Sequence, residues 1–136
     1  MGRGVQEIMI ETKVKKPRKR KRSRSFGEQA IEDYLLLHNI PYQREYSFDG
    51  CVSRKGNKLR FDFYLPTFDI AIEFQGQHHY QPVNKKKRAQ YVHITTKKHD
   101  QIKRDFVDAN NGKLVEISYL EKDKINEILD QLLEGI

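Results

Sequence analysis

Two segments with alternating apolar and polar residues, joined by a four-residue turn, constrain the fold of this chain most strongly. Residues 59–65 and 70–76 each have the two-residue period of a half-buried β-strand. The residues between them, 66–69, begin with proline and have the composition of a turn. We therefore predict a hairpin at the centre of the fold, with the apolar face of each strand in the core.

The segment before the hairpin predicts one helix and one strand. Ser25 and Glu28 have the spacing of a capping box, and the apolar residues that follow recur at helical spacing, which predicts a helix over residues 26–38. Residues 42–48 alternate in the manner of a half-buried strand. We expect a polar loop over residues 49–58.

The segment after the hairpin begins with an irregular stretch, residues 77–94, in which no clear period is visible. A helix is expected from Thr95 or Thr96, as its N-cap, to the glycine-containing signal at residues 110–112. A short strand over residues 114–117 follows, and a last amphipathic helix ends the chain.

The predicted order of elements is αβββαβα. Three consecutive strands favour an antiparallel meander, and the helix before the fourth strand implies a parallel pairing. We expect the α/β (α+β) class, in which a mixed central β-sheet is flanked by helices. One domain over residues 26–136 and a separate arm over residues 1–25 suit a chain of 136 residues.

The arm holds the positive charge of the chain. It contains ten Lys or Arg and two Glu, whereas the net charge of the whole chain is +7. Such a segment is predicted to be disordered and to bind DNA phosphates, and a solubility tail or a nuclear-localisation-like run is the alternative. The candidate DNA-binding residues are Lys19, Arg20, Lys21 and Arg22 in the arm and, in a second basic cluster, Lys85, Lys86, Lys87 and Arg88.

Two acidic residues interrupt the apolar pattern of the hairpin. If residues 65 and 70 pair, Asp62 stands opposite Glu73, where like charges repel. Mg²⁺ prefers carboxylate oxygens and would offset this repulsion. A metal ion there could polarise a phosphate and lower the pKa of a bound water, which is the chemistry of phosphodiester hydrolysis. The alternative is that both carboxylates are ordinary polar residues on a solvated face.

The same register places other side chains. Phe63 is predicted opposite Ile72, and Phe61 opposite Phe74, in the core. Arg60 is predicted opposite Gln75 on the face of the two carboxylates, where it would reach a phosphate or orient the nucleophile.

Residues 61–66, FDFYLP, and 72–80, IEFQGQHHY, resemble the PD-(D/E)XK nuclease superfamily. They are most similar to its branch associated with phage and mobile-element homing endonucleases, and more distantly to the very-short-patch repair nucleases. The similarity extends over about residues 26–119 and includes KHDQIK at 98–103. It implies a restriction-endonuclease-like core and a DNA endonuclease that uses Mg²⁺, with Mn²⁺ expected to substitute, bound by the two carboxylates.

The resemblance also implies roles for other residues. Gln75 stands where the superfamily most often has a catalytic lysine, so it would position water or phosphate, with Lys98 or Arg60 as the compensating cation. Glu28 matches an acid that completes the metal shell or orients water, and its alternative role is the capping box. His79 matches a histidine that acts near the leaving group, and its alternative is a structural histidine.

Two other functions are compatible with the sequence. A non-catalytic DNA-binding module would explain Gln75, although it would not need the two carboxylates. Zinc binding is the other, although the spacing of its ligands is irregular; they would be His78, His79, His93 and Cys51. We expect an intracellular protein, cytoplasmic or nucleoid-associated and compatible with a phage source, with DNA as partner, no membrane and no small-molecule cofactor. Cutting both strands of DNA is compatible with a homodimer.

Overall fold

A four-stranded mixed sheet forms the centre of the computed structural model, which describes residues 25–134. The strands lie in chain order, and they are β1 (Gln43–Val52), β2 (Lys58–Leu65), β3 (Ile70–Gln75) and β4 (Lys113–Ser118). The first three are antiparallel neighbours, and β4 runs parallel to β3. The predicted meander and parallel fourth strand are therefore confirmed. The predicted arm, with Lys19, Arg20, Lys21 and Arg22, lies outside the described residues.

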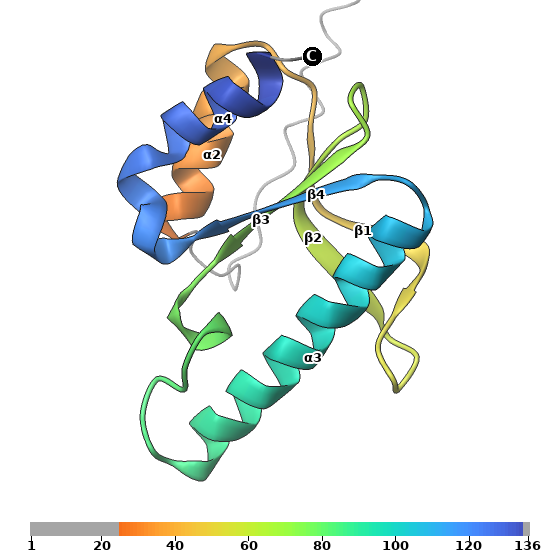
Figure 1. Ribbon diagram of the computed structural model, residues 1–136, viewed down its shortest axis with the longest axis vertical. Coiled ribbons are helices and arrows are strands. Elements are labelled where there is room, and N and C mark those ends of the chain that lie inside the picture. Colours follow the sequence, from red (N-terminus) through yellow and green to blue (C-terminus); the bar gives the residue numbers. More distant parts are fainter. Residues whose placement is uncertain (1–24, 135–136) are drawn as a thin grey trace, which may run out of the picture.

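Helices cover both faces of the sheet (Figure 1). On one face, α2 (Phe26–Leu37) packs beside α4 (Ile125–Glu134), which follows the short helix η2 (Tyr119–Lys124). On the other face lies α3 (Lys87–Ala109), which extends beyond the sheet towards the short helix η1 (Gln77–His79). Among the described residues, no helix has the length and apolar content needed to cross a bilayer. The order α2-β1-β2-β3-α3-β4-α4 confirms the predicted α/β arrangement.

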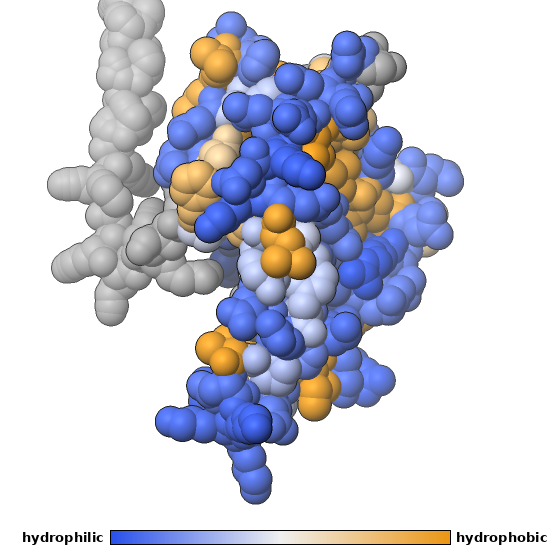
Figure 2. Space-filling view, turned by 60° about the vertical axis from the view of Figure 1, so that its left-hand side comes forward, coloured by the Kyte–Doolittle hydropathy of each residue, from blue (hydrophilic) through white to orange (hydrophobic). Residues whose placement is uncertain are grey.

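The sheet separates two hydrophobic cores. The core below α2 and α4 contains Ile31, Leu35, Phe63, Leu65, Ile70, Ile72, Ile117 and Leu129. The core below α3 is smaller and contains Cys51, Leu59, Phe61, Ala71 and Val107. Figure 2 shows one face of the molecule, which is mostly hydrophilic with small separate apolar patches, as expected when these two cores hold most of the apolar side chains.

The apolar side chains of β2 change from one face of the sheet to the other in the middle of the strand. Phe61 belongs to the α3 core, whereas Phe63 belongs to the core of α2 and α4. The prediction that the apolar residues of 59–65 share one face is therefore wrong. In β1, Glu45 lies between the partners of these two phenylalanines and has a φ of 51°, in the left-handed region. A left-handed residue turns its strand about the strand axis. The side chains therefore change from one face of the sheet to the other at Glu45 in β1 and at Asp62 in the neighbouring β2.

The predicted register holds only near the turn between β2 and β3. Leu65 pairs with Ile70 and Phe63 with Ile72, but the regular pairing ends there. The Oδ2 atom of Asp62 instead accepts a hydrogen bond from the backbone amide of Phe74, at 2.8 Å. Phe61 is not opposite Phe74, because the two rings belong to different cores.

The start of α2 agrees with the prediction from the sequence, whereas the end of β1 does not. α2 begins as predicted, since the side chain of Ser25 accepts a hydrogen bond from the amide of Glu28 at 3.1 Å. β1 is longer than predicted and occupies part of the expected loop over 49–58, because it continues to Val52. Cys51 is fully buried near that end, but Asp49 and Gly50 before it interrupt the strand period in the sequence.

α3 begins at Lys87, so the predicted threonine N-cap is wrong, and the predicted irregular segment over 77–94 is confirmed only for residues 80–86, between η1 and α3. The first half of this helix extends past the sheet and buries no apolar stripe, which is why periodicity did not reveal it. The helix ends where predicted. Its left-handed residue is Asn111, with a φ of 58°, and the amide of Gly112 donates to the carbonyl of Val107.

Gly27 allows α2 to approach the sheet closely. A Cβ atom at this position would lie 2.2 Å from the ring of Phe74. Because the ring would have to move, we expect Gly27→Ala to lower the free energy of unfolding by about 1–3 kcal/mol, measured by chemical denaturation. Leu37→Ala is the matched control on the same helix, since Leu37 is 76% exposed and its loss should change stability little. Equal stability of the two variants would contradict this close approach.

Candidate active site

Two carboxylates lie where β2 and β3 cease to pair. Glu73 is 4% exposed, and burial together with the charge of Glu73 raises the pKa of Asp62 from 3.8 to about 7. The two residues therefore interact, as predicted. They do not do so as directly opposed partners, because Asp62 bonds to the amide of Phe74 and Glu73 pairs in register with Glu116 of β4.

A lysine from α3 neutralises the more deeply buried of these carboxylates. The Nζ atom of Lys103 lies 2.7 Å from Oε2 of Glu73 and 5.3 Å from the centre of the Phe61 ring. Burial raises the pKa of Glu73, while the charge of Lys103 lowers it. Lys103 is thus the cation that pairs with Glu73.

Neither Lys98 nor Arg60, the cations predicted to compensate for Gln75, contacts Glu73. The side chain of Arg60 is 67% exposed, and Arg60 pairs with Ser47 of β1, not with Gln75. Lys98 is exposed and lines a groove with residues of the β1–β2 turn.

The signal for Lys103 was present in the helical spacing. Asp100, Lys103 and Val107 are three and four residues apart and so share one face of α3. Asp100 and Val107 are both buried on that face, so a lysine between them also points inwards.

Gln75 provides a buried hydrogen-bond donor. It is 3% exposed, and its Oε1 atom accepts a hydrogen bond from the hydroxyl of Tyr80 at 2.6 Å. Its Nε2 atom has no hydrogen-bond partner among the described residues. An unpaired buried donor costs about 1–3 kcal/mol, so a bound acceptor at this position would recover that free energy.

Glu28 reaches the site from α2. Its charge contributes to the raised pKa of Asp62, and its Oε1 atom lies 3.6 Å from Arg44 of β1. Arg44 also lies 3.8 Å from Glu32 and packs over the ring of Phe63. The backbone of Glu28 therefore serves the N-cap, while its side chain belongs to a charged network beside Asp62.

His79 joins the site from η1. Its Nδ1 atom lies 2.8 Å from Oδ2 of Asp100, which is buried on α3. The charge of a protonated His79 would lower the pKa of Glu73, so the ring lies near that carboxylate. A carboxylate on one ring nitrogen fixes the orientation of the imidazole, which suits either a structural or a catalytic histidine.

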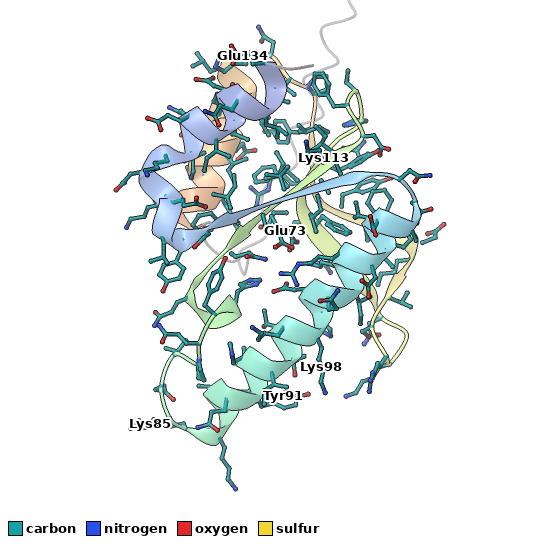
Figure 3. The ribbon with its side chains drawn as sticks, viewed as in Figure 1. Glu73, Lys85, Tyr91, Lys98, Lys113 and Glu134 are labelled. Carbon is teal, nitrogen blue, oxygen red and sulfur yellow. The ribbon has the colours of Figure 1, made fainter. Side chains whose placement is uncertain are left out.

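The second basic cluster lies away from the carboxylates. Figure 3 shows Lys85 near the far end of the extended half of α3, well separated from Glu73. Lys86 is the N-cap of the helix, and Lys87 and Arg88 begin it, all three exposed. These four residues form a basic tip that is available to an anionic partner.

Within residues 25–134, no group of three or more His, Cys, Asp or Glu side chains is arranged to hold a metal ion. Cys51, one of the four residues named for zinc binding, is fully buried in the α3 core. No protein-family model, curated protein or solved structure matches the chain.

Proposed function

We propose that the protein is a metal-dependent DNA endonuclease that hydrolyses phosphodiester bonds at the site formed by Asp62 and Glu73. The observation that carries the proposal is the half-buried position of Asp62 beside the buried carboxylate of Glu73, which raises the pKa of Asp62 to about 7. Buried like charges destabilise a fold unless a cation offsets them, and perturbed carboxylates of this kind are typical of active sites. The resemblance to the PD-(D/E)XK superfamily gives the same two residues this role.

The carboxylates fit Mg²⁺ in their chemistry. Mg²⁺ binds proteins through one or two carboxylates and keeps several waters, so Asp62 and Glu73 suffice as its protein ligands. When bound, the metal supplies Lewis acidity and lowers the pKa of a water molecule. Mn²⁺, which accepts the same oxygen ligands, is expected to substitute.

The remaining side chains suit hydrolysis of an anionic substrate. Lys103 brings a positive charge to Glu73, and this charge can also stabilise a phosphate in the transition state. The Nε2 atom of Gln75 can donate a hydrogen bond to a phosphate oxygen or to the attacking water. Glu28 can orient that water, and His79, held by Asp100, can protonate the departing oxygen.

A DNA-binding module without catalysis is the second candidate. The ion pair between Lys103 and Glu73 favours it, because this pair satisfies one carboxylate without a metal ion. Such a module would use the basic tip and the arm but would have no use for a half-buried carboxylate at Asp62.

Plasmid cleavage tests the proposal. We expect the full chain to nick or linearise supercoiled DNA, or to cut branched oligonucleotides, in Mg²⁺ and not in EDTA, because the two carboxylates need the cation to act on a phosphate. Asp49→Asn is the matched control, since Asp49 is a solvent-exposed carboxylate that pairs with Lys58, and it should retain activity. The proposal is wrong if wild type and Asp62→Ala are equally inert, or equally active.

A further inference from the structure

A groove of about 300 Å³ lies between the turn that joins β1 and β2 and the middle of α3. Tyr91, Lys98 and His99 of α3 form one wall, and Arg54 and Lys55 of the turn form the other. Figure 3 shows Tyr91 and Lys98 on the half of the helix that extends away from Glu73. The groove is therefore separate from the candidate active site.

The lining of this groove is suited to an anion that carries an aromatic ring. Three cationic side chains surround it, and none of the described residues that line it is acidic. A larger groove elsewhere on α3 shows the contrast, because it is lined by Asp105, Asp108 and Glu116 beside Arg104. Charge thus makes the first groove attractive to a polyanion and the second unattractive.

Tyr91 adds an exposed aromatic surface to the cations. It is 60% exposed and lies in the second turn of α3. Proteins that bind single-stranded nucleic acid combine cations that follow the backbone with aromatic rings on which bases stack. A volume of about 300 Å³ is at the lower end for ligand pockets and suits one strand, not a duplex.

The groove and the candidate active site share α3. Ile102 lines the groove, and the next residue, Lys103, contacts Glu73. In the same way His99 lines the groove, and the next residue, Asp100, holds His79. One strand of DNA that leaves the groove around this helix would therefore arrive beside the carboxylates.

We propose that this groove binds an unpaired strand of DNA, with a base stacked on Tyr91 and phosphates bound by Arg54, Lys55 and Lys98. The proposed binding of a DNA strand depends only on the residues of the groove. A substrate preference follows from it if the proposed nuclease function holds: the preferred substrate is then DNA with a single-stranded segment next to the cut, as in a branch or flap.

Fluorescence anisotropy tests the binding site without catalysis. The full chain carrying Asp62→Asn is titrated in EDTA against a labelled single strand and a duplex of equal length. Adding Tyr91→Ala should weaken binding of the single strand by about tenfold, because one stacking contact is lost, and should weaken duplex binding much less. Tyr91→Phe keeps the ring and should bind like the parent. Lys113→Gln removes an exposed lysine far from the groove and is the charge control.

The charges of the groove give a second readout. Lys98→Gln should reduce the slope of log affinity against log salt by about 0.7 for the single strand, because one phosphate contact is lost. The groove proposal is overturned if Tyr91→Ala binds the single strand like the parent, or loses affinity equally for the duplex.

The two proposals fail in different ways. If wild type cuts DNA in Mg²⁺ while Tyr91→Ala binds normally, the groove is overturned and the nuclease function stands. If Tyr91→Ala loses single-strand binding but wild type is inert in Mg²⁺, the groove is supported, and the nuclease function and the substrate preference are overturned.

Discussion

Asp62→Asn is expected to lower the rate of DNA cleavage in Mg²⁺ by about 10³-fold, because it removes a negative charge on which metal binding depends. The same variant should be more stable than wild type when no metal is present. Asparagine has nearly the same shape as aspartate and can still accept the hydrogen bond from the amide of Phe74. It cannot ionise, so it avoids the repulsion from Glu73.

The gain in stability should depend on pH. The folded state raises the pKa of Asp62 from 3.8 to about 7, so between these values the folded chain holds a proton that the unfolded chain has released. The contribution of Asp62 to the free energy of unfolding therefore falls as pH rises from about 4 to 7. Asp62→Asn should be more stable by about 1–3 kcal/mol at pH 8, and this difference should vanish near pH 4.

Denaturation in EDTA at a series of pH values measures this effect. Asp49→Asn, at an exposed position, should follow wild type throughout. If Asp62→Asn were no more stable than wild type at pH 8, the ionised carboxylate of Asp62 would not destabilise the fold, and the raised pKa that supports its proposed role would be contradicted.

Lys103→Met is expected to lower the free energy of unfolding by about 3 kcal/mol at pH 8, because it leaves the buried carboxylate of Glu73 without a partner. DNA cleavage should also be lost, since the site then lacks the lysine charge that is proposed to stabilise the phosphate in the transition state. At acidic pH the loss of stability should shrink. Without lysine, burial raises the pKa of Glu73 further, and the carboxyl is protonated.

Arg104→Met provides the matched control for this variant. Arg104 is the next residue of α3 and forms an ion pair with Glu116, but its side chain is 44% exposed, so its loss should cost about 1 kcal/mol or less. The double variant Lys103→Met with Glu73→Gln should recover most of the lost stability, because it removes the unpaired charge. A double variant as unstable as Lys103→Met alone would show that the effect comes from packing.

The architecture of the sheet was accessible to sequence reasoning because it depends on local patterns. Alternation in 59–65 and 70–76, with a proline turn between them, predicted the hairpin and its register as far as Phe63. The change of faces at Asp62 was not accessible. It depends on the left-handed backbone of Glu45, a residue type that gives no sign of such a conformation.

The two carboxylates of the candidate site, Asp62 and Glu73, could be predicted from the sequence, whereas Lys103 could not. Asp62 and Glu73 stand out because carboxylates interrupt apolar strands, whereas Lys103 is one of many lysines in the chain. The helical spacing places Lys103 on the face of Asp100 and Val107, but only the packing of α3 on the sheet shows that this face is buried while Lys98 is exposed. The first half of that helix was missed for a related reason: without a buried face, its residues show no apolar period.

α3 combines two kinds of constraint in one continuous helix. Its second half is fixed by the core and by the ion pair with Glu73, so few substitutions there preserve the chemistry. Its first half touches little of the core and carries Tyr91 and the basic tip. Under the proposed nuclease function, substitutions in the first half should alter DNA binding and those in the second half should alter cleavage, although the two sets lie only a few helical turns apart on one helix.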